Sequence, residues 1–481
     1  MTEHPVGETT RDPVRGRAAP SLLAAALLLV LVPAAAWAQG FGVFEQGTCA
    51  MGRGSAVAAS SSCRDGSSLF FNPAGIAGHR GLTVSAGGTG ILALGQFTAD
   101  RTGDVTKMDR KVIPVPHAYL TYGIDDRFSV GLGFFTPYGL ETAWPDRSDA
   151  AFLGYDTRLH SFYLEPAAAV RLLDGRVSVG AGLTFVMSKI KLNQLLDLSA
   201  QRVPDPSVPP GTTFGQLGIP NHTAFADAHL SSDVATGWGG NFGLQVEVTD
   251  AITFGARYLT RVTLDYTGSA SFDPVSTGIV LPAGNPFGAP AGTPLDAILQ
   301  AAGIFSGPLA DQGIRTSITM PDQLVLALGV QPTDRLELEA DYYWTHWSTF
   351  GRLPIEFQGG AGTEVRVEDY RDTNGIRLGG QLDMDHGITL RLGYVYNPPA
   401  APAKTVTPLL PEAKRSQFAG GLGWRMDRHW ELNVSYSYLL QADRRGRVQD
   451  PLPGMEPTTA LNTGAYQYAG HLFATTVTFH L

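Results

Sequence analysis

The feature of this sequence that most constrains its fold is a long series of segments, each roughly ten residues long, in which apolar and polar residues alternate. The clearest one starts at Trp430, where Trp430, Leu432, Val434 and Tyr436 alternate with polar residues. A period of two is the period of a β-strand, whose side chains point to opposite faces in turn. Similar segments recur along most of the chain, so the sequence predicts an all-β protein.

The connections between these segments alternate between short and long. The short ones are turns such as Asp125-Asp126 and Asp174-Gly175. The long ones are rich in Pro, Gly and Ser and lie near residues 139–157, 194–235, 269–314, 350–370, 398–415 and 442–466. Short turns at one rim and long loops at the other are typical of transmembrane β-barrels, whereas a soluble sandwich has no reason to sort its loops in this way.

We therefore predict a transmembrane antiparallel β-barrel over residues 80–481. The barrel must close, because each unpaired backbone N–H or C=O costs several kcal/mol in hydrocarbon. An even number of strands brings both ends to the same side. The pattern predicts 14 strands, near residues 81–97, 111–123, 127–138, 158–172, 176–193, 236–248, 251–268, 315–331, 335–349, 371–384, 388–397, 416–426, 429–441 and 467–481.

The first residues are typical of an export signal. Arg11, Arg15 and Arg17 precede an apolar run over residues 21–32, and Ala36-Trp37-Ala38 forms a small-x-small cleavage site. We predict a cleaved signal peptide over residues 1–38. An uncleaved anchor is the alternative, but the run is short for a membrane span. No later run of about 18 apolar residues follows, so we do not expect a helical membrane protein.

The composition excludes several classes of function. The formal net charge of -9 offers no basic excess for nucleic acid. Only 16% of residues are charged, against about 25% in an average soluble domain, which argues against an ordinary cytosolic enzyme. There is no Gly-x-Ser-x-Gly or His-Glu-x-x-His motif, and the two Cys lack CxxC spacing. We expect no enzymatic activity, cofactor or metal, with a barrel-borne lipid hydrolase as the enzyme alternative.

Residues 39–79 do not continue the strand pattern and are rich in Gly, Ala and Ser. Small side chains allow close packing against an inner wall, so this segment could fill the lumen as a plug. A flexible periplasmic leader is the alternative.

Several motifs occur in one order along the chain: Glu45-Gln46-Gly47-Thr48, Met51-Gly52-Arg53-Gly54, Phe71-Asn72-Pro73-Ala74-Gly75, Phe135-Thr136-Pro137-Tyr138-Gly139-Leu140, Met320-Pro321-Asp322-Gln323 and Asp341-Tyr342-Tyr343-Trp344-Thr345-His346-Trp347-Ser348-Thr349-Phe350. Together they resemble the FadL family of outer-membrane long-chain fatty acid transporters, with related aromatic-hydrocarbon channels. The resemblance covers nearly all of the chain after the signal.

The resemblance implies a barrel plugged by an N-terminal hatch, with Asn72, Pro73 and Ala74 as the hatch motif. It implies passive uptake of fatty acids or aromatic hydrocarbons by a monomer embedded in outer-membrane lipids. The cargo is first caught by the extracellular loops and then leaves sideways through a kink in the third strand. Gly weakens a strand ladder and Pro removes a donor, so the kink is expected at Gly131, Gly133 and Pro137.

Within the hatch, Cys49 and Cys63 would close a loop of about 15 residues, worth roughly 3 kcal/mol. An oxidising envelope permits such a bond. We expect a disulfide, and two free thiols are the alternative.

Burial of hydrocarbon yields about 0.8 kcal/mol per methylene, so an apolar groove would set affinity. The groove is expected in the long loops, at Phe214, Leu217, Phe225, Leu295, Ile298, Leu299 and Phe305, with a short amphipathic helix near residue 295. Packing of these loops on each other is the alternative. A cation would orient a carboxylate, and the candidates are the predicted lumen-facing Arg257, Arg261, Arg377 and Arg391. A general diffusion porin is the main alternative function, followed by an adhesin or structural barrel.

Overall fold

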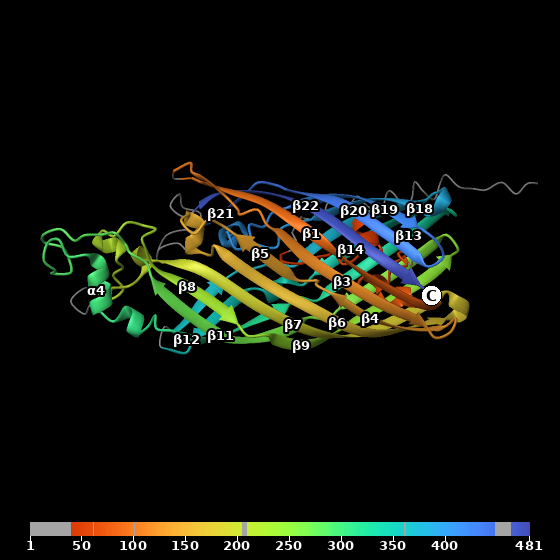
Figure 1. Ribbon diagram of the computed structural model, residues 1–481, viewed down its shortest axis with the longest axis horizontal. Coiled ribbons are helices and arrows are strands. Elements are labelled where there is room, and N and C mark those ends of the chain that lie inside the picture. Colours follow the sequence, from red (N-terminus) through yellow and green to blue (C-terminus); the bar gives the residue numbers. More distant parts are fainter. Residues whose placement is uncertain (1–39, 61, 101, 204–208, 360–361, 448–462) are drawn as a thin grey trace, which may run out of the picture. The chain divides into compact units, whose positions relative to one another are not determined.

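The computed structural model describes residues 40–481 except 61, 101, 204–208, 360–361 and 448–462. The predicted signal peptide lies outside the described residues. The alternating segments form one antiparallel sheet that closes on itself (Figure 1). Closure occurs between β1 (Gly81–Ala99) and β22 (Thr463–His480), which pair from Thr83 opposite His480 to Ala99 opposite Gly464.

The described residues form 14 barrel strands, several of them divided by a short break, and the predicted closed barrel is confirmed. After β1 come β3 (Val112–Gly123), β4 (Phe128–Phe135) with β5 (Gly139–Ala143), β6 (Asp156–Leu172), β7 (Val177–Asp197), β8 (Ala224–Ser232) with β9 (Ala235–Thr249), and β10 (Ile252–Leu259) with β11 (Val262–Pro274). The remaining strands are β12 (Gln312–Met320) with β13 (Gln323–Thr333), β14 (Leu336–Thr345) with β15 (Arg352–Phe357), β16 (Gly362–Val367) with β17 (Thr373–Asp383), β18 (Ile388–Asn397), β19 (Arg415–Arg425), β20 (Trp430–Gln441) and β22.

Two short strands, β2 (Val105–Lys107) and β21 (Arg444–Arg447), extend the sheet at the long-loop rim. The predicted loop over residues 194–235 is wrong in part, because β7 continues to Asp197 and β8 pairs with it. The inward positions of β8 are mainly Ala, which makes its alternation weak in the sequence.

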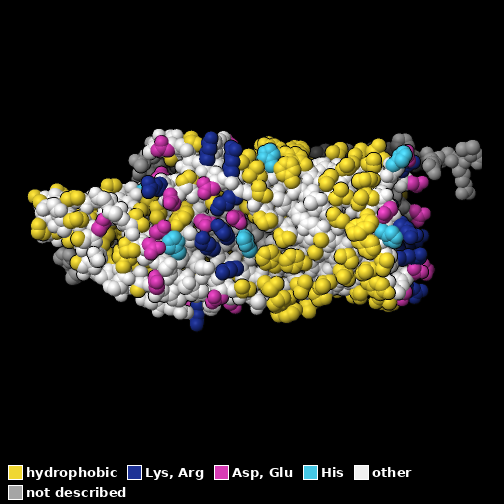
Figure 2. Space-filling view, viewed as in Figure 1, with side chains coloured by type: hydrophobic (Ala, Val, Ile, Leu, Met, Phe, Trp, Pro, Cys, Tyr) yellow, Lys and Arg dark blue, Asp and Glu magenta, His cyan; other side chains and the backbone are white. Residues whose placement is uncertain are grey.

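The barrel strands expose apolar side chains on their outer face and bury polar ones inside, which is the reverse of a soluble protein. Large apolar residues such as Leu132, Phe242 and Leu392 are exposed on the strands, while Asn241 and Glu339 are buried. Figure 2 shows the exposed apolar side chains as a band that is flanked by charged residues on both sides. Such a band matches the hydrocarbon layer of a membrane, and the alternation of the sequence encodes it. None of the described helices is long and apolar enough to cross a bilayer.

The described residues of 40–79 lie inside the barrel, where the red segment of Figure 1 is enclosed by the strands. They contain α2 (Thr48–Gly52), α3 (Ser68–Phe71) and a 3-10 turn, Pro73–Ile76. Helix α2 contacts β18, β19, β20 and β22, and the turn contacts β6, β7 and β9. We refer to residues 40–79 as the hatch.

Candidate functional site

The hatch is fixed to the wall at its Asn-Pro-Ala turn. The side-chain carbonyl of Asn72 accepts a hydrogen bond from the Ala74 amide (3.1 Å), which caps the turn. Its amide group donates to Ala58 within the hatch (2.6 Å) and to Leu244 of β9 (3.0 Å). The wall is close here, because a Cβ added at Gly243 would lie 2.1 Å from Asn72 Oδ1. Asn72 therefore joins two parts of the hatch to each other and to the barrel.

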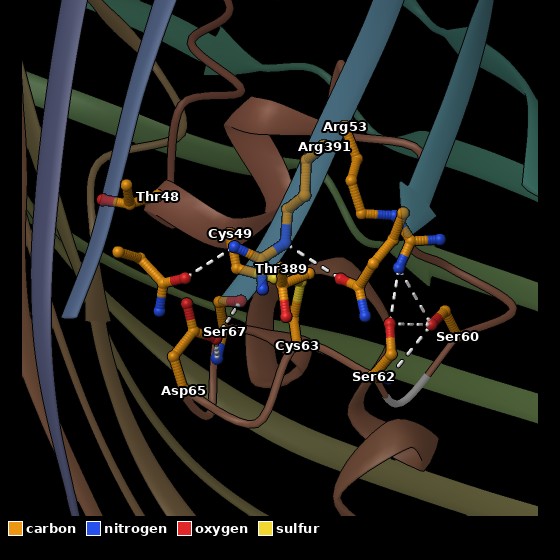
Figure 3. Close-up of a disulfide and its surroundings, with 12 residues drawn as sticks. Thr48, Cys49, Arg53, Ser60, Ser62, Cys63, Asp65, Ser67, Thr389 and Arg391 are labelled. Atoms are coloured by element: carbon orange, nitrogen blue, oxygen red, sulfur yellow. Dashed lines mark hydrogen bonds between the residues drawn. A yellow bond between two sulfur atoms is a disulfide. The ribbon is translucent and has the colours of Figure 1, made fainter. Parts of the chain in front are cut away.

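A disulfide and an ion pair hold the first half of the hatch. Cys49 of α2 is bonded to Cys63, with their Cα atoms 5.7 Å apart (Figure 3). Arg53 Nη2, fully buried, lies 2.8 Å from Glu337 and 3.4 Å from Glu339, both on β14. Burial disfavours the charge of Arg53, but the two carboxylates outweigh it and hold the pKa of this guanidinium above its ordinary value. This part of the hatch is therefore cross-linked internally and charge-paired to the wall.

The third barrel strand is interrupted where the hatch meets it. Strand β4 ends at Phe135 and β5 begins at Gly139. At this break the hatch pairs with the strand instead: the Val43 amide donates to the Pro137 carbonyl (2.8 Å), and the Gly139 amide donates to the Phe41 carbonyl (3.0 Å).

Gln46 completes this pairing with its side chain. Its amide group donates to the carbonyls of Thr136 (2.7 Å) and Val43 (3.1 Å), and its Oε1 accepts from the Thr136 amide (2.8 Å). Tyr119 of β3 donates to the Gln46 carbonyl. One side chain thus satisfies both backbone groups of Thr136, which a neighbouring strand would otherwise do.

Only one of the three predicted kink residues lies in this break. Pro137 lies within it, whereas Gly131 and Gly133 lie inside β4, paired with Thr121 and Tyr119 of β3. The two glycines do not form the break. Gly131 instead allows a close approach of the hatch, because a Cβ there would lie 2.9 Å from Leu69.

An opening in the wall lies beside the break. Strand β3 pairs with β4 only from Ala118 to Gly123, so its residues 112–117 have no ladder partner on the third strand. A cavity of about 390 Å³ occupies this place, and we call it the lateral cavity. Its lining includes hatch residues 40–43, residues 113–116 of β3, and Leu140, Leu159 and Leu410.

A second cavity of about 120 Å³ lies above the hatch, and we call it the inner cavity. Its lining is mainly apolar and includes Leu192, Leu230, Ile314, Ile318 and Ile355. Four residues line both cavities: Phe41, Leu140, Leu159 and Leu410. The two cavities are therefore neighbours, and Phe41 of the hatch borders both.

Two cations border the inner cavity. The side chain of Arg366 is 10% exposed, donates to Gln194 and Leu153, and lies 3.4 Å from Glu364. Its Nε is the atom that lies closest to Glu364, although the geometry is not that of a hydrogen bond. Arg158 also lines the cavity but is held by Asp156 at 3.1 Å. Both cations are thus held by neighbouring groups, and Arg366 is the more buried of the two.

The four predicted carboxylate anchors lie elsewhere. Arg257 is buried and donates to Asn241 (2.9 Å) and Gln323 (2.8 Å). Arg377 stacks on the rings of Phe44 and Tyr343, and Arg391 donates to Gln381 and Asn433. These three face the lumen, but they support the hatch and its surroundings. Arg261 is exposed in the break between β10 and β11, so its predicted lumen-facing position is wrong.

The predicted loop groove is a packed cluster. Phe214, Phe225, Leu295 and Leu299 are buried together, while Leu217, Ile298 and Phe305 are half-buried. The expected helix is present as α4 (Leu295–Ala301). In this structure the side chains pack on each other, which corresponds to the alternative left open by the sequence.

Sequence reasoning gave Phe41 and Arg366 no role at the cavities, because neither carries a local signal for one. Gln46 was recognised only as part of the Glu45-Gln46-Gly47-Thr48 motif, without its contact to Thr136. The loop that follows β18 folds inward, where Glu412 accepts hydrogen bonds from the Ala400 and Ala401 amides and from the Gly40 amide of the hatch. The only available signal was the apolar Leu409-Leu410 pair in a loop otherwise rich in Pro and Ala.

Comparison with known proteins gives consistent results. A family model described as "Outer membrane protein transport protein (OMPP1/FadL/TodX)" matches residues 29–481. Outer membrane protein P1 of Haemophilus influenzae is 26% identical over 448 residues, which cover 87% of this chain and 89% of that protein. The long-chain fatty acid transport protein of Escherichia coli O6:H1 is 25% identical over 430 residues, which cover 86% and 90%.

Solved structures share the fold. A FadL homologue from Pseudomonas aeruginosa superposes with a TM-score of 0.75 at 20% identity, covering 92% of this chain and 100% of the other. The toluene transporter TodX from Pseudomonas putida gives a TM-score of 0.67 at 20% identity, covering 92% and 99%. With a family match over nearly its whole length, the chain belongs to the OMPP1/FadL/TodX family of outer-membrane transport proteins, and it is a transporter and not an enzyme.

Proposed function

We propose that this protein takes up long-chain fatty acids or similar hydrophobic compounds by passive diffusion, and that the cargo leaves sideways through the lateral cavity. The observation that carries this proposal is the set of four residues common to the inner and lateral cavities. A cargo that follows them passes from an apolar interior to the wall opening without crossing the hatch. The family relatives named as fatty acid and toluene transporters support the class of cargo.

The volume of the inner cavity limits how much of a cargo molecule it can hold. A cavity of about 150 Å³ is large enough for benzene, so the inner cavity, at about 120 Å³, is near the size of one small ring or a few methylenes. A long acyl chain has room only if it extends into the lateral cavity. Each buried methylene contributes about 0.8 kcal/mol, so a chain that fills both cavities binds more tightly than one that fills the inner cavity alone.

In this proposal Arg366 orients a cargo that carries a carboxylate. Arg366 lines the inner cavity, and a charge-assisted hydrogen bond to a carboxylate contributes about 1.5 to 3 kcal/mol. Replacement of Arg366 by Gln should weaken fatty acid binding and leave binding of an uncharged alkylbenzene nearly unchanged. Equal losses for both ligands would contradict this role.

The path itself is tested by uptake in proteoliposomes. Leu159 is 5% exposed and lines both cavities, so Leu159→Trp fills the junction. We expect at least a tenfold slower uptake of a labelled fatty acid. Leu183→Trp is the matched control, since Leu183 is 54% exposed on the outer face. Equal uptake by both variants would refute the path, and a large steady ion conductance of the unsubstituted protein would favour a general porin.

The chain's processing and assembly belong to the same proposal. We infer cleavage after Ala38 and a monomer that is surrounded by outer-membrane lipids. Intact mass of the purified protein tests the cleavage site, and its size in detergent tests the monomer.

A further inference from the structure

A cavity of about 350 Å³ lies at the long-loop edge of the hydrophobic band, on the outer face of the barrel. We call it the rim depression. Strands β1, β20 and β22 form its floor, and the segment that follows β2 forms one side. Its lining includes Leu94, Gln96, Lys107, Arg110, Leu440 and Ala469.

The apolar row on the floor of the rim depression faces the lipid, whereas Tyr468 of the same lining also borders the lateral cavity. Along β1, Ala93 and Phe97 are buried inside the barrel, so Leu94 points outward. Leu94 pairs with Ala469 of β22, and Ala469 pairs with Leu440 of β20. Three outward apolar side chains therefore lie in a row across adjacent strands, and they continue the apolar band.

An aromatic pair marks the edge of the band just below this row. The Tyr436 hydroxyl and His471 Nδ1 are 2.8 Å apart on the outer face. Phe473 follows and is 59% exposed. Aromatic residues with a polar end are characteristic of the membrane interface. The rim depression thus lies at the level of lipid headgroups.

Two cations and one carboxylate line the upper side of the rim depression. Lys107 and Arg110 are exposed, and neither forms an ion pair with another described residue. Lys111 is exposed next to them. The lining carboxylate, Asp443, accepts a hydrogen bond from Gln467 (2.9 Å), and Asp109 is exposed between the two cations. Figure 2 shows Lys and Arg side chains together with Asp and Glu beyond the band on the long-loop side.

We propose that the rim depression binds a phosphorylated lipid of the outer leaflet, such as lipid A. Lys107 and Arg110 would bind its phosphate, because basic side chains beside an apolar membrane surface recognise anionic headgroups. One acyl chain would lie over Leu94, Ala469 and Leu440. This amphiphile matches the apolar and basic halves of the site. The residues assigned to bind it, Lys107, Arg110, Leu94, Ala469 and Leu440, line neither cavity of the cargo path.

The test measures how much lipid A the full-length purified protein retains in native mass spectrometry, after incubation in mixed micelles with lipid A and neutral phosphatidylcholine. Replacement of both cations, Lys107→Gln with Arg110→Gln, should reduce retained lipid A at least tenfold, since each lost charge-assisted contact corresponds to about a tenfold change. Ala469→Trp, which fills the floor without changing a charge, should also reduce retention. Lys189→Gln is the matched control, because Lys189 is another exposed lysine of the outer face that does not line this cavity.

Competition identifies the part of the lipid that is recognised. Inorganic phosphate at equal concentration should displace little lipid A, since it lacks the acyl chain, and laurate should displace little, since it lacks the phosphate. Strong displacement by laurate would show a carboxylate site and overturn the proposal, as would unchanged retention in the double variant. Cargo uptake by the double variant should remain normal, so failure of this proposal is distinguishable from failure of the cargo path.

Discussion

Replacement of Gln46 by Ala should loosen the hatch where it joins the broken third strand. The Gln46 side chain makes three hydrogen bonds there, two of them to Thr136, which is 7% exposed. Loss of this side chain leaves the N–H and the carbonyl of Thr136 without a partner. Each unsatisfied buried group costs about 1 to 3 kcal/mol, so the paired state should lose at least about 2 kcal/mol after partial rescue by water.

A loss of about 2 kcal/mol corresponds to an opening that is roughly thirtyfold more populated. Amide hydrogen exchange of residues 41–46 and 136–139 reports this opening directly. We expect exchange there to be at least about thirtyfold faster in Gln46→Ala. We also expect faster cargo uptake, because Phe41 of the same segment stands at the junction of the two cavities.

The matched control is Gln245→Ala, which removes a buried glutamine that donates to Ala58 of the hatch (3.2 Å). It should leave exchange at Thr136 unchanged. If exchange at Thr136 in Gln46→Ala equals that of the parent protein, Gln46 does not hold this junction and the reasoning is wrong.

Three further predictions concern the hatch. Replacement of Cys49 and Cys63 by Ala should destabilise the hatch by about 3 kcal/mol, as the 14-residue separation implies, and should increase its proteolysis while the barrel stays intact. Asn72→Ala should lower uptake without preventing barrel assembly, measured by heat modifiability; unchanged uptake would remove the motif's role. Burial, with nearby Arg64 and His480, lowers the pKa of His79 to about 4, so acidification from pH 6.5 toward 4 should reduce stability by up to about 1.4 kcal/mol per pH unit. His79→Gln should flatten this slope in thermal melts, and an equal slope in both proteins would contradict it.

The barrel could be predicted because every second side chain of a membrane strand faces lipid and is apolar. Trp430, Val434 and Tyr436 are exposed on β20, while Glu431 and Asn433 between them are buried. The sequence therefore records the strand, its register and its outward face together. Strand β8 lies beyond the apolar band, and there the pattern weakens to Ala alternating with mixed polar residues.

The site could be predicted only in part, because it depends on contacts between distant segments. An arginine on a lumen-facing strand can bind cargo or support the hatch, and its sequence position is the same in both cases. Arg377 supports the hatch, since its guanidinium carbon lies 4.0 Å from the ring centre of hatch residue Phe44. Arg366 of β16 borders the inner cavity because its side chain reaches Gln194 of β7 and Leu153, which are distant from it in the sequence.

The folding of the long loops is the second reason why the site could be predicted only in part. Leu410 lines both cavities because Glu412 binds the Gly40 amide and draws its loop into the barrel. A loop with many Pro and Ala residues gives no indication of such an inward path. The predicted groove residues were correctly recognised as apolar, but burial against each other satisfies them as well as a ligand does.

Photolabelling tests the path most directly. A fatty acid with a diazirine at the end of its chain would be bound to the protein in membranes, irradiated, and located by mass spectrometry. We predict labels at the four residues common to both cavities, Phe41, Leu140, Leu159 and Leu410. Labels confined to the loop cluster around Phe214 and Leu295, or to the outer face of the band, would contradict passage of the cargo through the barrel wall.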